Sequence, residues 1–167
     1  MGRFEKQTVT PIIKMFGMLS ESLLDKFGPC GLLCEKCFAF GNGPIHLHAR
    51  QLNHQLGNFE AYANRFVTLL NEPVFGKYPE FKVFLDLLSA TSCKGCRKQE
   101  CHLFNACKIK QCYKEKELAF CFQCNEFPCY HTGFDDHLKQ RWISINHRIQ
   151  EVGLETYYQE IKDKPRY

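Results

Sequence analysis

The sequence lacks the motifs that mark most enzymes and the long apolar run that marks a membrane protein. It has no H-E-x-x-H, no glycine-rich phosphate loop and no H-x-E paired with P-C-x-x-C. Its early apolar run, IIKMFGML, is interrupted by Lys14 and is too short to span a bilayer. Residues 1–20 carry no signal-peptide pattern. We therefore expect a cytoplasmic protein with no membrane association, and a binding protein rather than an enzyme.

Strand patterns are also missing, because apolar and polar residues do not alternate over any useful length. Apolar residues recur instead every three or four positions, which predicts helices. The predicted helices cover residues 18–27, 47–72, 78–90, 112–118, 132–152 and 154–161. The fold class we expect is mostly α: a small single domain of about four to five helices with an irregular, cysteine-rich region of zinc knuckles. Its expected parts are an N-terminal extension (1–28), a cysteine-bearing core (29–129) and C-terminal helices (130–163).

Two of these helices carry clear apolar stripes. The stripe of the 47–72 helix consists of Leu52, Leu56, Phe59, Ala63, Phe66 and Leu70. That of the 78–90 helix consists of Phe81, Phe84, Leu85 and Leu88. Such stripes usually face a protein core, and we predict that both do so here. Gly57 is the weak point of the first helix, and Pro79 suits the first turn of the second.

The abundant residue is cysteine, with 11 in the chain. Without an export signal the expected compartment is reducing, where disulfides are rare, and an odd number of cysteines fits complete pairing poorly. Eight of the 11 lie between Cys93 and Cys129, where Cys93/Cys96 and Cys121/Cys124 form C-x2-C pairs. Each pair places two sulfurs on one tight turn, and four thiolates make the tetrahedral shell that structural zinc prefers.

A third C-x2-C pair, Cys34/Cys37, follows Cys30 in the run CGLLCEKC. The C-x3-C-x2-C spacing is that of radical S-adenosylmethionine enzymes, but those enzymes have an aromatic residue where this chain has Lys36. They also need a partial or full α/β barrel, and the chain shows no βαβ periodicity. We interpret Cys34 and Cys37 as a knuckle and Cys30 as a further ligand or a small buried hydrophobe.

The order of these cysteines resembles that of a known family. The matching segments are CGLLCEKC (30–37), CKGC (93–96), CKIKQC (107–112), CFQCNEFPC (121–129) and VGLETY (152–157). They are similar to those of small cysteine-rich bacterial and archaeal proteins that share a domain of unknown function with a suspected zinc role. The resemblance implies a cytoplasmic prokaryotic protein with a metal-binding fold and no known reaction. The chain departs from the family pattern between Cys101 and Cys107, which leaves the role of Cys101 and His102 open.

The candidate metal ligands are ten cysteines, and we expect them to hold two zinc ions. They are Cys30, Cys34, Cys37, Cys93, Cys96, Cys107, Cys112, Cys121, Cys124 and Cys129. One partition joins the 93/96 and 121/124 pairs on one ion and Cys107 and Cys112 with members of the 30–37 group on the other. A second partition closes 93/96 with 107/112. A third site completed by His102 or His131 remains open, and Cys101 is expected to be a non-ligand. An iron–sulfur cluster is the alternative cofactor, although the ferredoxin spacings are absent.

The formal net charge of +4 comes from one segment. Residues 93–117 contain seven basic and three acidic residues, which accounts for the whole excess. A zinc ion bound by four thiolates carries a formal charge of about −2, so two such sites would cancel the excess. The competing interpretation is a nucleic-acid face with stacking aromatics, formed by Lys94, Arg97, Lys98, Lys108, Lys110, Lys114, Phe104 and Tyr113.

These observations favour a zinc protein of unknown cellular role, in which zinc is structural and the chain presents a surface to a protein partner. An iron–sulfur or thiol redox protein is the first alternative, since thiols near lysines are reactive. A nucleic-acid-binding zinc protein is the second.

Overall fold

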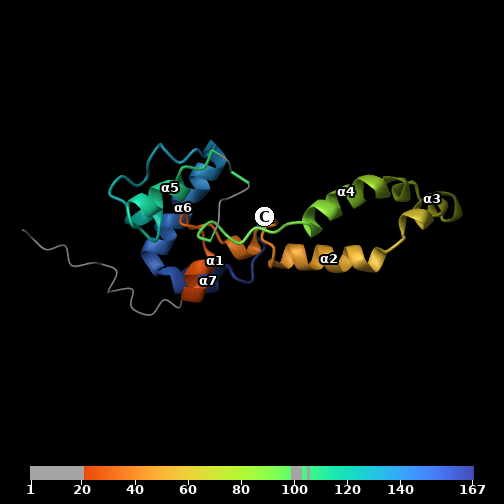
Figure 1. Cartoon of the computed structure of the whole chain (residues 1–167), viewed down its shortest axis with the longest axis horizontal. Helices are drawn as coiled ribbons and strands as arrows, with labels where there is room; N and C mark the ends of the chain where they lie inside the picture. Colours follow the sequence, from red (N-terminus) through yellow and green to blue (C-terminus); the bar gives the residue numbers. More distant parts are fainter. Residues whose placement is uncertain (1–20, 99–102, 105) are drawn as a thin grey trace, which may run out of the picture.

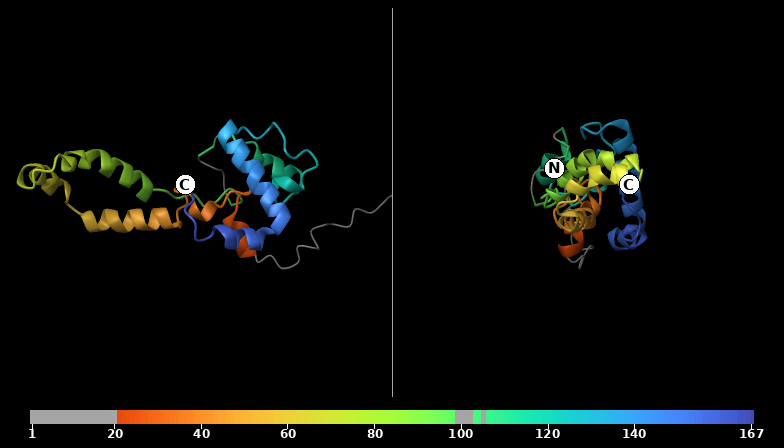
Figure 2. Two further views of the ribbon diagram at one scale, coloured as in Figure 1. Left: turned by 180° about the vertical axis from the view of Figure 1, so that it is seen from behind. Right: turned by 90° about the vertical axis from the view of Figure 1, so that its right-hand side faces the viewer.

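The computed structural model describes residues 21–98, 103–104 and 106–167, and these form a rounded body with a helical arm projecting from it (Figures 1 and 2). The body contains α1 (Glu21–Lys26), α5 (Ile109–Glu115), α6 (Asp136–Val152) and α7 (Leu154–Ile161). The arm, residues 44–89, contains α2 (Pro44–Leu56), α3 (Glu60–Leu69) and α4 (Tyr78–Ser89). Three 3-10 turns complete the structure: η2 (Cys34–Lys36), η3 (Pro73–Lys77) and η4 (Cys121–Gln123).

The described part of the chain is mostly helical, as predicted. It has seven α-helices and no strand, and its only β structure is two isolated bridges, Phe27–Leu33 and Phe40–Cys93. The helix predicted for 154–161 has those bounds, and Gly153 ends α6 by donating its N–H to the Ile149 carbonyl at 2.9 Å. None of the described helices has the length and apolarity that crossing a membrane would require.

The single helix predicted for residues 47–72 is wrong, because the chain breaks at Gly57 into α2 and α3. Gly57 has φ 47° and ψ −115°, a conformation that only glycine adopts without strain. The predicted weak point is therefore a true helix end, and the number of helices is higher than expected.

Replacing Gly57 with alanine should destabilise the arm by about 1–3 kcal/mol, the usual cost of forcing a side chain into such a conformation. The cost comes from the backbone alone, since an added β-carbon would meet no atom within 4 Å. The control is Gly76→Ala, where φ is not positive and the new β-carbon would lie 3.8 Å from Val67 Cγ2. Urea unfolding should show a loss for Gly57→Ala only. Equal effects of the two substitutions would contradict the turn at Gly57.

The body is organised around Phe27, which is completely buried. Its ring lies 6.4 Å from Phe120, 6.1 Å from Tyr157 and 6.1 Å from Tyr158, measured between ring centroids. These contacts join α1, the segment before η4, and α7 into one apolar cluster. Trp142 and Ile149 of α6 are also buried, on the face that the helical periodicity predicted.

In the arm, α2 and α4 pack against each other as an antiparallel pair (Figure 1). Ala49 and Leu85 are buried between the helices, and Asn53 donates hydrogen bonds to Asp86 at 2.7 Å and to Ser89 at 3.3 Å. His46 is buried on α2, with Nδ1 lying 3.0 Å from Thr91 Oγ1. The histidines predicted to pack on a helix or face solvent do so, since His48 and His54 are exposed on α2.

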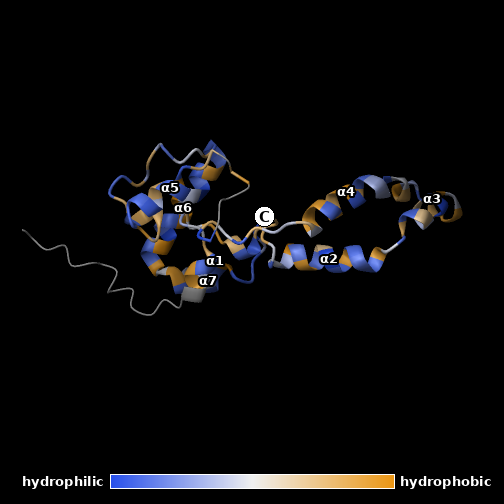
Figure 3. Cartoon of the chain, in the orientation of Figure 1, coloured by the Kyte–Doolittle hydropathy of each residue, from blue (hydrophilic) through white to orange (hydrophobic). Residues whose placement is uncertain are grey.

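The prediction that both apolar stripes face a core is only partly right. Leu85 is buried, but Phe84 is 61% exposed and Phe81 is 43% exposed. On the other stripe Leu52 and Leu70 are exposed as well. The reason is that the arm is one layer thick, so each helix has a neighbour on one side only. Apolar residues are distributed along the arm helices (Figure 3), and ten large ones between residues 44 and 89 are exposed.

Candidate metal centres

Two of the C-x2-C pairs fold into the same turn. In each, the second cysteine donates its N–H to the carbonyl of the first: Cys37 to Cys34 at 2.8 Å, and Cys124 to Cys121 at 3.0 Å. The second cysteines have nearly the same backbone angles, φ −71° and ψ 138° for Cys37, and φ −79° and ψ 135° for Cys124. Both turns therefore present two thiols from one short 3-10 segment, which is the arrangement that the spacing predicted.

The third pair, Cys93 and Cys96, lies against the first. Cys93 donates its N–H to the Ala39 carbonyl and accepts from the Gly41 N–H, both at 3.0 Å. A β-carbon on Gly95, which has φ +92°, would lie 3.9 Å from the Cys34 β-carbon. The Gly95 N–H also donates to Cys93 Sγ at 3.4 Å, a bond that favours a thiolate. We call Cys34, Cys37, Cys93 and Cys96 the arm-base cysteines.

The segments just before α2 and just after α4, where the arm leaves and rejoins the body (Figure 1), carry the arm-base cysteines. Cys37 precedes α2, and Cys93 follows α4. The Phe40–Cys93 bridge therefore closes the base of the helical arm. This contact joins segments that are more than fifty residues apart in the chain.

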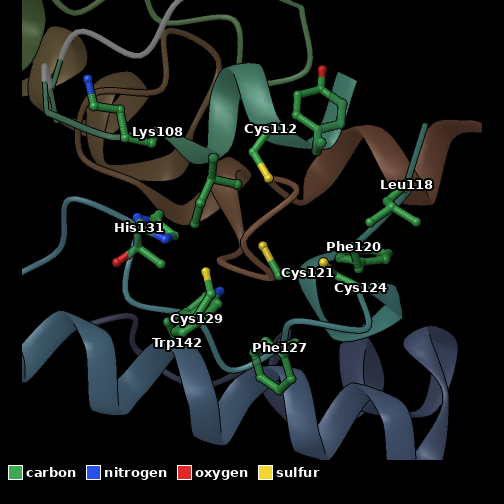
Figure 4. Close-up of a pocket in the computed structure, with 13 residues that line it drawn as sticks. Lys108, Cys112, Leu118, Phe120, Cys121, Cys124, Phe127, Cys129, His131 and Trp142 are labelled. Carbon is green, nitrogen blue, oxygen red and sulfur yellow. The ribbon is translucent and has the colours of Figure 1, made fainter. Parts of the chain in front are cut away.

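Four more cysteines line one cavity in the body: Cys112, Cys121, Cys124 and Cys129, which we call the pocket cysteines (Figure 4). Cys112 lies on α5, Cys121 begins η4, Cys124 directly follows η4, and Cys129 lies in the loop before α6. The cavity encloses about 520 Å³ of empty space, part of it open to solvent. Trp142 and His131 also line it.

The pocket favours protonated thiols unless a cation is present. Burial, together with the neighbouring thiols Cys129 and Cys112, raises the pKa of Cys121 to about 12. Burial likewise raises the pKa of Cys112. The fully buried indole Nε1–H of Trp142 lies beside Cys121 and lowers that pKa, yet it has no acceptor at good hydrogen-bond geometry among the described residues. A bound metal ion would reverse this balance, because it deprotonates coordinating thiols and gives the indole a thiolate acceptor.

One lysine beside the pocket already carries compensating charge. Lys116 Nζ lies 2.7 Å from Glu126 Oε1 and 3.4 Å from Cys124 Sγ. The bond to Glu126, followed by that to Cys124, raises the pKa of Lys116. This cation is one of the seven basic residues of the 93–117 segment, and it faces a candidate thiolate.

Cys30 and Cys107 lie in the apolar cluster beside Trp142 rather than in either group of four. Cys30 is buried, and burial raises the pKa of its thiol. Its sulfur is 3.1 Å, and that of Cys34 3.5 Å, from the position that a β-carbon on Gly28 would occupy. The sequence allowed Cys30 to be either a further metal ligand or a small buried hydrophobe, and its burial favours the second role. Its sulfur nevertheless lies near that of Cys34, one of the arm-base cysteines.

The thiols do not form a closed cluster as they stand. Within residues 21–98, 103–104 and 106–167, no three histidine, cysteine, aspartate or glutamate side chains are close enough to hold one ion. No disulfide joins any two of the ten described cysteines. Binding an ion would therefore require the thiols of a group to move closer together. Cys101 and His102, whose roles the sequence left open, lie outside the described residues.

The side chains of Asn146 and Arg97 hold the cysteine-bearing loops, a structural role that the sequence did not predict. Asn146 of α6 is completely buried; it donates to the Cys30 carbonyl at 2.8 Å and accepts from the Phe122 N–H at 3.1 Å. Arg97 donates to the carbonyls of Phe27 at 2.8 Å and Ala119 at 2.6 Å, and burial lowers its pKa. No periodicity reveals such roles, because each depends on carbonyls that are distant in sequence.

Together the fold and these two groups of thiols define a mostly helical, cysteine-rich protein with a projecting helical arm. The family model described as a protein of unknown function, DUF3795, matches residues 26–133. This is well over half of the chain, so the protein belongs to the DUF3795 family, and the predicted resemblance to a family of unknown function is confirmed. Searches of curated proteins and of solved structures found no match.

Proposed function

We propose that this protein binds zinc at two four-thiolate centres and uses the ions to fix its shape, not to catalyse a reaction. The arm-base cysteines would form one centre and the pocket cysteines the other. The observation that carries the proposal is the pairing of Cys93 with the segment that directly follows the Cys34–Cys37 turn. Cys93 donates to the Ala39 carbonyl and its own carbonyl accepts from the Gly41 N–H, both at 3.0 Å, which places the Cys93–Cys96 turn beside the Cys34–Cys37 turn. This pairing favours a partition that differs from both sequence-based ones.

The donor set supports zinc. Two tight turns that together offer four thiols match a closed structural zinc site, in which no position is left for a substrate. Thiolates also suit iron–sulfur clusters, so this remains the alternative cofactor. The hydrogen-bond donors beside Cys93, Cys124 and Cys121 would stabilise bound thiolates.

An ion at the arm base would act as a clasp. It would join the segments that enter and leave the arm, and thereby hold α2 and α4 in a fixed direction relative to the body. A fixed arm is suited to presenting a surface to a protein partner, which is the role that we propose for it.

The contacts of the basic segment support charge compensation over a nucleic-acid face. Arg97 is engaged with backbone carbonyls, Lys98 lies 2.6 Å from Asp25, and Lys116 contacts Cys124 and Glu126. The guanidinium of Arg97 also lies 5.8 Å from the centroid of Tyr113, one of the two rings proposed to stack on bases. Residues engaged in this way are poorly placed to meet phosphates.

Elemental analysis after anaerobic purification tests the proposal. We expect a colourless protein with about two zinc ions per chain, one for each group of four thiolates. Cys34→Ser/Cys93→Ser and Cys121→Ser/Cys124→Ser should each lose about one ion, because each removes two ligands of a single centre. Cys107→Ser serves as the control and should keep both ions. A brown protein with broad visible absorption and bound iron would select the iron–sulfur alternative, and a protein free of both metals would overturn the proposal.

A further inference from the structure

The arm exposes far more apolar surface than the body. Of the 14 large apolar side chains that are exposed among the described residues, ten lie between residues 44 and 89. Three of them, Val83, Phe84 and Leu87, form a continuous stripe on α4, and Val83 is 72% exposed. Contiguous apolar surface of this kind marks an interaction site in a folded protein.

The arm also buries little by itself. Within residues 44–89, the buried side chains are those of His46, Ala49, Ala63, Tyr78 and Leu85. Stable domains pack at least two layers of secondary structure, whereas α2 and α4 form only one. The apolar periodicity of α4 is that of a helix with a covered face, but no segment among the described residues covers Val83, Phe84 or Leu87. A second chain would supply the missing layer.

The charges of the arm favour a second copy as that layer. Residues 44–89 carry four basic and four acidic side chains, so two arms do not repel each other. Lys82 and Asp86, which neighbour the α4 stripe, neutralise each other at 2.6 Å. An isologous dimer brings the same patch of both subunits together, and an uncharged apolar stripe is complementary to itself.

The available area is sufficient for such a dimer. A stable interface buries about 800 Å² per partner, which corresponds to roughly eight half-exposed side chains of this size. The arm offers ten.

We propose that the protein forms a homodimer through its arms, with the α4 stripes of two copies packed together so that α2 and α4 of each contribute to a four-helix bundle. The proposal rests on the proposed function in one respect, since it names the partner that the arm is presented to. It does not depend on which metal is bound.

Light scattering after size-exclusion chromatography of the full chain tests this. At about 50 µM, above the dissociation constant of even a modest interface, we expect a mass near twice the 19.5 kDa of one chain. Val83→Glu/Phe84→Glu should weaken dimerisation more than about 100-fold, because it buries like charges against each other. The matched control is Tyr130→Glu, which changes an 87% exposed aromatic residue on the body and should leave the dimer intact.

Mixing two charge variants distinguishes self-association from misfolding. Phe84→Glu and Phe84→Lys should each be monomeric, and an equimolar mixture should regain the dimer because opposite charges then meet at the interface. Far-ultraviolet circular dichroism should show unchanged helix content in each variant. A monomeric wild-type chain, a dimer that survives Val83→Glu/Phe84→Glu, or a mixture that stays monomeric would overturn the proposal. Zinc content is measured on the same samples, so a monomer that retains two ions refutes the dimer and leaves the proposed function standing.

Discussion

If the protein binds zinc as we propose, removing the metal is expected to unravel residues 93–129 and to lower the melting temperature of the protein sharply. Structural zinc contributes about 10–16 kcal/mol of apparent binding free energy in finger peptides, which equals or exceeds the net stability of about 5–15 kcal/mol of a typical domain. The described part of this segment has only α5 and the η4 turn as regular structure. Few backbone hydrogen bonds would therefore hold it once the thiols are released.

Hydrogen exchange read by mass spectrometry, with and without a strong chelator, locates this effect. Exchange should increase in 93–98 and 117–131, and the α2–α4 pair should become less protected near its base. Helix α6 provides the internal control, because Trp142 and Ile149 stay packed in apolar surroundings. A protein shown by elemental analysis to be metal-free, yet unchanged in exchange and melting, would count against structural zinc.

Asn146→Leu is expected to destabilise the protein by about 2–6 kcal/mol. The substitution leaves the buried Cys30 carbonyl and the partly buried Phe122 N–H without this partner, and each group that loses its partner costs about 1–3 kcal/mol. Because Phe122 lies within the Cys121–Cys124 segment and Cys30 begins the Cys30–Cys34 segment, both cysteine-bearing loops lose a hydrogen bond to α6.

The matched control for Asn146→Leu is Ser144→Ala on the same helix. Ser144 is exposed, and among the described residues its hydroxyl bonds only to the Gln140 carbonyl, so its loss should change stability by no more than about 0.5 kcal/mol. Guanidinium unfolding of both variants and the wild type gives the difference directly. A loss below about 1 kcal/mol for Asn146→Leu would show that α6 does not hold these loops through this side chain.

The helices could be predicted from sequence because their signals are local. Gly153 and Pro79 mark helix ends, and the spacing of Ile145, Ile149 and Val152 identifies α6. The break at Gly57 was visible as a weak point but was not assigned as an end, since α2 and α3 continue one apolar rhythm across it. The sequence alone did not separate a helix interrupted by glycine from two helices.

The arrangement of the cysteine turns could not be predicted in the same way. The Cys93–Cys96 and Cys34–Cys37 turns meet because α2, α3 and α4 fold back on themselves, and spacing contains no information about that return. The exposure of Phe84 and Phe81 could not be predicted for a related reason. Periodicity shows that one face of a helix is apolar, but not whether that face is buried within the same chain.

The body also contains more apolar core than the cysteine pattern suggested. Phe27, Phe120 and Tyr157 join α1, the η4 segment and α7 through ring contacts that involve no cysteine. We therefore expect both metal binding and apolar packing to stabilise the protein. The apolar clusters of the body would hold α6 and α7, and the ions would hold the loops and the base of the arm.

The central claim is that thiol-bound ions close the arm base and the pocket, and anomalous diffraction at the zinc edge tests it most directly. The account predicts one anomalous peak among Cys34, Cys37, Cys93 and Cys96 and another among Cys112, Cys121, Cys124 and Cys129, each with four sulfurs at about 2.3 Å. Crystals grown under reducing conditions that show no anomalous peak at either position, with the sulfurs still apart, would contradict it.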